Sequence, residues 1–116
     1  MLPKKHRLKK KNDFARVTRG GRTAAIQYLV LRFMANQREE SRVGFVCGKK
    51  VAKRAVARNR IKRRLMEIVR ALLPSIRPGF DLIFLTRPGI ADLEFEEIKM
   101  AVEGLLKRAR ILTNNK

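Results

Sequence analysis

The sequence has little of the chemistry that disulfides, metal sites and membrane spans require. Its 116 residues include one cysteine, Cys47, and one histidine, His6. An internal disulfide is therefore impossible, and a zinc site made from the usual ligands is disfavoured. No apolar run approaches the ~20 residues of a membrane-spanning helix, and no apolar stretch follows the basic N-terminus as it would in a secretory signal. We expect a soluble protein of the cytoplasm.

Aromatic residues and acids are also scarce. Aromatics make up 6% of the chain and tryptophan is absent, so a core drawn from the 45% of hydrophobic residues must be mainly aliphatic. Only 10 Asp and Glu oppose 29 Lys and Arg, which gives a formal net charge of +19. Such an excess is typical of proteins that bind a polyanion, above all a nucleic acid. The length fits one domain, so we treat residues 1–116 as a single domain that binds nucleic acid.

The positive charge is concentrated in two segments. Residues 4–11 hold six basic side chains and no acid, whereas residues 49–70 hold ten basic side chains and one acid, Glu67. The acids gather instead in residues 92–97. Like charges at helical spacing repel one another and lower stability. We therefore expect an anionic partner on residues 49–70, in preference to a merely solvated basic face.

The apolar pattern predicts a small α+β sandwich, with helices packed on one sheet. Residues 1–11 are expected to form a mobile basic arm. A short helix follows, with Asn12 as its cap and Gly20–Gly21 at its end. Residues 23–35 are rich in strand formers and can split into two strands. Residues 42–48 form a further strand, which we expect to pair with the preceding strand region as a hairpin.

The second half of the chain alternates helix, strand and helix. Residues 55–73 carry an apolar stripe at helical spacing, made of Ala57, Ile61, Leu65, Ile68 and Leu72. Residues 81–86 are an apolar run typical of a buried central strand. It should lie parallel to the strand before the helix, as in a βαβ unit. Asp92 is expected to cap the last helix, and residues 112–116 to form a frayed tail.

The helix over residues 55–73 offers cations on every side except its apolar stripe. At about 100° per residue, Arg58 and Lys62 lie on one flank of the stripe, and Arg60 and Arg64 lie on the other. This distribution suits an irregular, enveloping anionic partner better than a flat membrane surface. The planar guanidinium groups also suit bidentate contacts with phosphates and base edges.

One block of fifteen residues resembles a known family. The block is Lys49-Lys50-Val51-Ala52-Lys53-Arg54-Ala55-Val56-Ala57-Arg58-Asn59-Arg60-Ile61-Lys62-Arg63. It is similar to the signature of the bacterial ribonuclease P protein subunits. Leu8 to Phe14, Arg42-Val43-Gly44, Asp81-Leu82-Ile83 and Arg87-Pro88 agree with the same family, in order and at family length.

This resemblance implies a function that composition alone does not show. Proteins of the family bind a large catalytic RNA, and the holoenzyme is an endonuclease that removes 5′ leaders from precursor tRNA. The RNA holds the active site and its Mg²⁺ ions, so the resemblance implies no catalytic residue and no protein-bound metal or cofactor. It also implies a fold like the second domain of ribosomal protein S5, with a left-handed βαβ crossover. The general handedness rule would instead predict a right-handed crossover, as in about 98% of cases.

The resemblance also divides the candidate site residues into two surfaces. Phe14, Val46, Arg58 and Lys62 would line a cleft for the single-stranded leader, where bases stack on aromatic rings with little sequence preference. Where many relatives have a second aromatic, this chain has Thr18. The residues assigned to the RNA subunit are Lys49, Lys50, Lys53, Arg54, Asn59, Arg60, Arg63 and Arg64.

Several alternatives remain open at this point. Phe14 can equally be the core anchor of its helix, and Tyr28 can face either side of its strand. His6 stands alone, and the acids of the last helix are explained by the helix dipole, so we predict no active site in the protein. Partners other than RNA, such as DNA or a membrane, are not expected. The alternative function is that of a structural RNA-binding protein of the ribosomal type.

Overall fold

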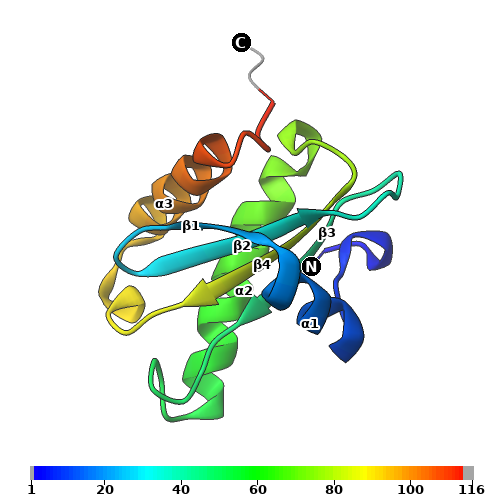
Figure 1. Cartoon of the computed structure of the whole chain (residues 1–116). Helices are drawn as coiled ribbons and strands as arrows, with labels where there is room; N and C mark the ends of the chain where they lie inside the picture. Colours follow the sequence, from blue (N-terminus) through cyan, green and yellow to red (C-terminus); the bar gives the residue numbers. More distant parts are fainter. Residues whose placement is uncertain (1, 114–116) are drawn as a thin grey trace.

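The computed structural model describes residues 2–113 and is built around a four-stranded sheet (Figure 1). The strands are β1 (Arg22–Ala25), β2 (Leu29–Ala35), β3 (Arg42–Val46) and β4 (Phe80–Thr86), in the order β1-β2-β4-β3. β1 and β2 pair antiparallel, so the strand region over residues 23–35 does split in two. β4 lies antiparallel to β2 and parallel to β3, which confirms the predicted parallel pair.

The expected hairpin between β2 and β3 is wrong. β4 lies between these two strands, although it is the last strand in the sequence. The physical reason is its composition, because Leu82, Ile83 and Phe84 are at most 1% exposed and fill both faces of the sheet. A strand that is apolar on both faces is most stable at the centre, with a helix layer on each side.

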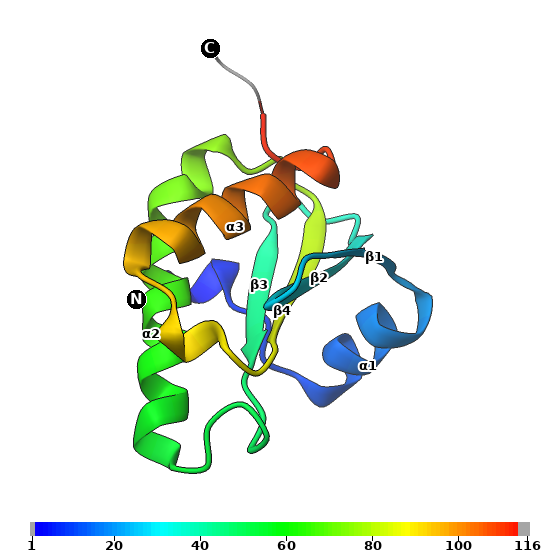
Figure 2. The same cartoon turned by 90° about the vertical axis from the view of Figure 1, so that its left-hand side faces the viewer.

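Three helices cover the two faces of the sheet (Figure 2). α2 (Ala55–Leu72) and α3 (Phe95–Arg108) lie on one face, and α1 (Lys11–Gly20) lies on the other. The described residues also form three short 3₁₀ helices: η1 (Lys4–His6) precedes α1, η2 (Leu73–Ser75) follows α2, and η3 (Ile90–Asp92) precedes α3. The result is an α+β domain of three layers.

The β3–α2–β4 connection is left-handed. When β3 and β4 are viewed running upward with α2 behind the sheet, β4 lies to the right of β3 (Figures 1 and 2). The fold therefore has the crossover that the family resemblance implied, and it departs from the right-handed rule.

Each face of the sheet has its own core. Leu29, Leu31 and Phe33 of β2 join the larger core beneath α2 and α3. Ile83 of β4 joins Leu8 and Val17 in the smaller core beneath α1, and Phe14 and Met34 pack against that core. Tyr28, whose side of the strand the sequence left open, directly precedes β2 and packs against the larger core.

The N-terminal segment is packed against the domain, which corrects the expectation of a mobile arm. Leu2 is 2% exposed and Leu8 is 5% exposed. The Leu8 N–H donates to the Val43 carbonyl at 3.0 Å, and Arg7 forms a bridge with Val43 at the free edge of β3. The two leucines anchor the segment while its lysines point outward. Residues 114–116 of the predicted tail lie outside the described residues, and Leu112 pairs with Ile76.

Two helix caps also differ from the prediction. α1 begins one residue before Asn12, and its N-cap is Lys10 without a side-chain cap, although Asp13 does lie in the first turn. α3 is capped by Glu94, which forms a reciprocal capping box with Glu97, and Asp92 ends the preceding 3₁₀ turn. A capping box satisfies two free N–H groups at once, which a lone Asp92 cap does not.

Candidate RNA-binding site

The exposed side of α2 is an almost unneutralised row of cations. Ile61, Leu65, Ile68 and Val69 are buried and hold the helix against the sheet. Within residues 2–113, the only ion pair formed by the ten basic residues of segment 49–70 is Arg70–Glu67, at 3.9 Å. The positive charge concentrated in this segment is therefore available to bind an anionic partner.

The loop before α2 extends this cationic surface. Its basic residues are all exposed: Lys49, Lys50, Lys53 and Arg54. Arg58 fixes the end of the loop, since its Nη1 donates to the carbonyls of Ala52 at 3.0 Å and Lys53 at 2.8 Å. The α2 N-terminus has no side-chain cap and no acid in its first turn. Its free N–H groups and helix dipole therefore add to the attraction for phosphate.

The two flanks of α2 face different parts of the molecule. Arg60 and Arg64 border a small hollow beside Ala91 of η3, on the α3 side. Arg58 and Lys62 lie on the opposite flank, toward the β3 edge of the sheet. Asn59 and Arg63 are exposed between these flanks. The residues predicted to bind the RNA subunit thus form one surface, with Arg64 half-buried at its border.

Phe14 and Val46 lie on the α1 face of the sheet. The Phe14 ring lies directly on Gly44, where an added Cβ would come within 2.8 Å of Phe14 Cε1. Phe14 is half-buried, so it packs in the smaller core and also keeps part of its surface in solvent. Val46 shares the strand face of Gly44 and is 39% exposed. Thr18, one turn after Phe14, is exposed and supplies no second ring.

The four predicted leader-binding residues come from both sides of the sheet. Phe14 and Val46 are on the α1 face, whereas Arg58 and Lys62 are on α2, beyond the edge strand β3. No hydrogen bond or ion pair joins them within residues 2–113. Arg58 also has the structural role of holding the loop, which sequence reasoning did not anticipate.

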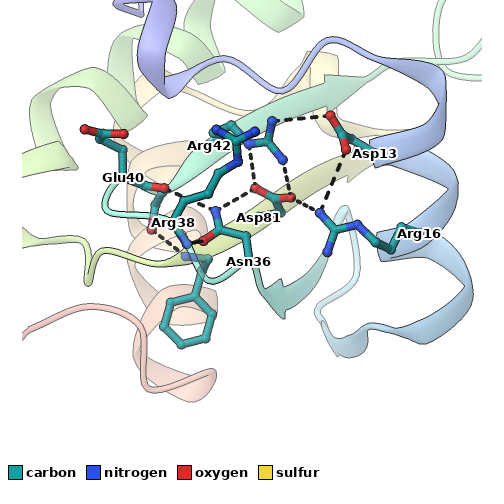
Figure 3. A network of polar contacts seen from close by, with 9 residues as sticks. Asp13, Arg16, Asn36, Arg38, Glu40, Arg42 and Asp81 are labelled. Atoms are coloured by element: carbon teal, nitrogen blue, oxygen red, sulfur yellow. Dashed lines mark hydrogen bonds and ion pairs between the residues drawn. The ribbon is translucent and has the colours of Figure 1, made fainter.

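A buried carboxylate attaches α1 to the sheet, and sequence reasoning missed it (Figure 3). Asp81 of β4 is fully buried, and it accepts hydrogen bonds from Arg42 Nε at 2.9 Å and Nη2 at 2.8 Å. Arg16 of α1 donates to the same carboxylate at 2.5 Å, and Asn36 Nδ2 donates at 2.9 Å. Arg42 also reaches Asp13 of α1 at 3.3 Å. Asp81, Arg42, Arg16, Asp13 and Asn36 are called the Asp81 clamp below.

The charges in the Asp81 clamp hold its central groups ionised. Burial by itself would raise the pKa of Asp81, but hydrogen bonds from Arg42 and Asn36 and the positive charges of Arg42 and Arg16 lower it below its ordinary value. The hydrogen bond from Arg42 to Asp81 raises the pKa of the guanidinium, against the opposing effect of burial. The clamp thus fixes the angle at which α1, with Phe14, lies across the sheet.

The fold and this surface define a class of protein. A small α+β domain that leaves a cationic loop and helix unneutralised is typical of proteins that bind a nucleic acid. Among residues 2–113, the structure contains no helix with the length and hydrophobicity of a transmembrane segment.

Comparison with known proteins gives the family. The family model for ribonuclease P matches residues 2–110. The chain is 37% identical to the ribonuclease P protein component of Cyanothece sp., with 97% of this chain and 98% of that one covered. It is 39% identical to that of Roseiflexus castenholzii, with 96% and 91% covered.

Solved structures agree with this assignment. A Staphylococcus aureus RNase P protein mutant with defective mRNA degradation activity matches with a TM-score of 0.87 at 30% identity, covering 94% of this chain and 92% of that one. The RNase P protein from Thermotoga maritima matches with a TM-score of 0.81 at 30% identity, covering 88% and 96%. The chain belongs to the ribonuclease P protein family. It is the RNA-binding component of a ribonucleoprotein endoribonuclease that acts in tRNA 5′ processing, and its partner is an RNA subunit.

Proposed function

We propose that the protein binds the RNA subunit through α2 and its preceding loop, and the single-stranded leader of precursor tRNA along the α1 side. The RNA-subunit surface consists of Lys49, Lys50, Lys53, Arg54, Asn59, Arg60, Arg63 and Arg64. The observation that carries this proposal is the cationic surface of segment 49–70, whose ten basic residues form a single ion pair within residues 2–113, that of Arg70 with Glu67. Phosphate contacts would neutralise these charges and release counterions.

The leader would run past Phe14 and Val46 and meet the cationic flank of α2 at Arg58 and Lys62. A half-buried Phe14 suits this role, because the face packed on Gly44 fixes the ring and the remaining surface is free for a base. Stacking on a ring is tolerant of base identity, as a general processing enzyme needs. Val46 would add apolar contact.

Hydrolysis itself would be performed by the RNA subunit and its Mg²⁺ ions, without a metal or cofactor held by this chain. The protein would contribute affinity for the precursor and would reduce repulsion between the two RNAs. A cytoplasmic location belongs to the same proposal, because precursor tRNA is processed there. DNA is not an expected partner. Protein freed of RNA should therefore leave precursor tRNA intact with or without Mg²⁺, and Mg²⁺-dependent cleavage by the RNA-free protein would contradict this division of labour.

Mutations should separate the two surfaces. Arg60→Ala with Arg64→Ala should weaken assembly with the RNA subunit, and saturating protein should restore normal processing. Phe14→Leu with Lys62→Ala should leave assembly intact but lower affinity for precursor tRNA by about 1–3 kcal/mol, the value of one stacked base. Leucine keeps the packing on Gly44, and Arg58 is left in place because it holds the loop.

Mature tRNA is the decisive control, because it has no leader. The leader-side variant should bind it as the unmodified protein does, whereas a folding defect would weaken both ligands. Lys107→Ala, an exposed cation on α3, is the matched control for loss of charge. Equal weakening of precursor and mature tRNA in a protein with an unchanged circular dichroism spectrum would refute the leader surface. Recovery of ribosomal RNA alone with the purified protein would favour the structural alternative.

A further inference from the structure

A second cationic surface lies at the other edge of the sheet, away from α2. β2 is seven residues long and β1 is four, and their pairing ends at Arg22 and Phe33. The last two residues of β2, Met34 and Ala35, therefore extend beyond β1. The start of β4 and the end of α3 complete the walls of a hollow of about 470 Å³. This volume lies within the range of roughly 300–1,000 Å³ typical of sites that bind small molecules.

The lining of this hollow combines arginines with aromatic and other apolar side chains. Arg22, Arg77 and Arg110 surround it, and all three are exposed. None of the three guanidinium groups has a hydrogen bond or an ion pair within residues 2–113, and no acid lines the hollow. The lining includes two half-buried side chains: Phe80, which packs against the larger core, and Met34, which packs against the smaller core on the α1 face of the sheet. Three unneutralised arginines around an aromatic side chain are complementary to a nucleotide, with its anionic phosphate and flat base.

The backbone at Arg110 supports a use for its side chain. Arg110 follows the end of α3 and has a φ of 62°, in the left-handed region that favours glycine. Its N–H donates to the Lys107 carbonyl, and the next N–H, of Ile111, donates to the Leu106 carbonyl. This is the helix ending at which glycine is the most stable residue. Arginine at this position makes the end of the helix less stable than glycine would, and a role of the arginine side chain in binding would explain its presence.

The hollow continues along α1. A second hollow shares Gly20 and Met34 with the first, and its other lining residues are Asn12, Ala15, Arg16 and Arg19 of α1. Of its two arginines, Arg16 is already engaged with Asp81 in the Asp81 clamp. Arg19 is exposed and, like the arginines of the first hollow, has no ion pair within residues 2–113. Two adjoining hollows with cations along them match an extended chain of nucleotides better than a single small anion.

We propose that these hollows form a second binding site for single-stranded RNA, in which Phe80 stacks on a base and Arg22, Arg77 and Arg110 contact phosphates. This site goes beyond the function proposed above, because it is centred at the β1 edge and includes no residue of α2. Its second hollow runs along α1 but does not include Phe14, the residue of that helix to which the leader is assigned. A single strand is specified because a base must leave its stack to reach Phe80, which a duplex does not allow. The site gives the protein an RNA contact that it can use while α2 is occupied.

Photo-crosslinking can test this site separately from the others. A short unstructured RNA that carries 5-iodouridine is irradiated with the full-length protein, and crosslinked residues are mapped by mass spectrometry. We expect a crosslink at Phe80 whose yield saturates with RNA concentration, together with a separate crosslink at Phe14 if the leader surface is correct. Since the two crosslinks are read independently, loss of one proposal leaves the other standing.

The variants decide what causes the Phe80 crosslink. Arg77→Ala with Arg110→Ala should lower RNA affinity at Phe80 and reduce the slope of log K against log[salt] by about 1.4, the value for two lost single-strand phosphate contacts. Lys107 lies in the last turn of α3, close to Arg110 in the sequence but outside the lining of the hollow. Lys107→Ala should therefore leave the Phe80 crosslink unchanged. If circular dichroism shows that the double variant does not fold, Arg22→Ala on β1 is used in its place. This single variant should reduce the slope of log K against log[salt] by half as much.

Three results would overturn the proposal. The first is the absence of a Phe80 crosslink in the unmodified protein. The second is an equal loss in the Lys107→Ala variant, which would mean that overall charge and not this site binds the RNA. The third is competition by duplex RNA as strong as that by a single strand of the same length.

Discussion

The Asp81 clamp yields the sharpest prediction about stability, through the substitution Asp81→Asn. Asparagine keeps the shape of the side chain but removes the charge that three donors share. It also replaces one carboxylate oxygen with an NH2 group, which can only donate a hydrogen bond. The neighbouring guanidinium groups of Arg42 and Arg16 cannot accept that hydrogen bond. The strand, its neighbours and the apolar core are unchanged, so the experiment isolates the electrostatic contribution.

The expected loss follows from the burial of the partners. The Asp81 side chain is 0% exposed and that of Arg42 is 13% exposed, so the substitution removes the buried counter-charge of a nearly buried cation. It leaves Arg42 with only the partly exposed carboxylate of Asp13, at 3.3 Å. Breaking a buried pair by removing one partner costs about 3–5 kcal/mol. Arg16 adds little to this figure, because its side chain is 41% exposed and solvent screens its charge. The loss is a large part of the about 5–15 kcal/mol that stabilises a typical domain.

Urea unfolding followed by circular dichroism measures this loss, and its pH dependence identifies the cause. The pKa of Asp81 is lower in the folded protein than its ordinary value of 3.8. Its contribution is therefore complete above the unfolded pKa and is lost as the pH falls through the folded pKa. The difference in free energy of unfolding between the unmodified protein and Asp81→Asn should be constant near neutral pH and should narrow below about pH 4.

A matched control keeps this reasoning open to refutation. Asp92 of η3 is exposed, and Asp92→Asn should change the free energy of unfolding by no more than about 0.5 kcal/mol. A cost below about 1 kcal/mol for Asp81→Asn would show that the clamp does not stabilise the fold as its geometry indicates. A difference that stays the same between pH 7 and pH 3 would show that the ionised carboxylate is not the source of the stability.

Further predictions concern the RNA surface, the Phe14 contact and the α3 cap. Binding to the RNA subunit should weaken with salt at a log–log slope of about −3.5 or steeper, as expected for five or more phosphate contacts, and a slope near −1 in a titration would mean that α2 is not the main docking surface. Gly44→Ala should cost about 1–3 kcal/mol because its methyl group overlaps the Phe14 ring. Adding Phe14→Ala should remove much of that penalty, and a double-mutant cycle in urea that showed strict additivity would contradict the contact. Glu94→Ala should cost about 1 kcal/mol through loss of the capping box, whereas an unchanged thermal midpoint would show that the cap contributes nothing.

Local patterns predicted the secondary structure well, because burial of one helix face or one strand run leaves a period in the sequence. The stripe through Ile61, Leu65 and Ile68 correctly indicated α2, and the run from Asp81 to Thr86 correctly indicated a buried central strand. The same period separated the two flanks of α2. The same periods did not predict which strands pair. Both β3 and β4 could pair with β2, and β4 takes this central position because it is apolar on both faces.

The N-terminal segment shows how a strong local signal can mislead. Six cations in residues 4–11 suggested a solvated arm, but Leu2 and Leu8 bury themselves against the domain and the backbone pairs with Val43. Two apolar residues separated by a basic stretch have no recognisable period. Their effect depends on a strand edge that only the folded sheet provides.

The charge, the position of the cationic helix and the family can be read from the residues alone, because these depend on residue types at short spacing. The partners of Asp81 depend on the fold, since Arg42, Asn36 and Arg16 lie 39, 45 and 65 residues away along the chain. The fold also creates the arginine-lined hollow, whose walls come from β1, β2, β4 and the end of α3. Such groupings form when segments that are distant in the sequence pack against the same surface. The free energy of that packing depends on the whole fold, so no local sequence pattern predicts it.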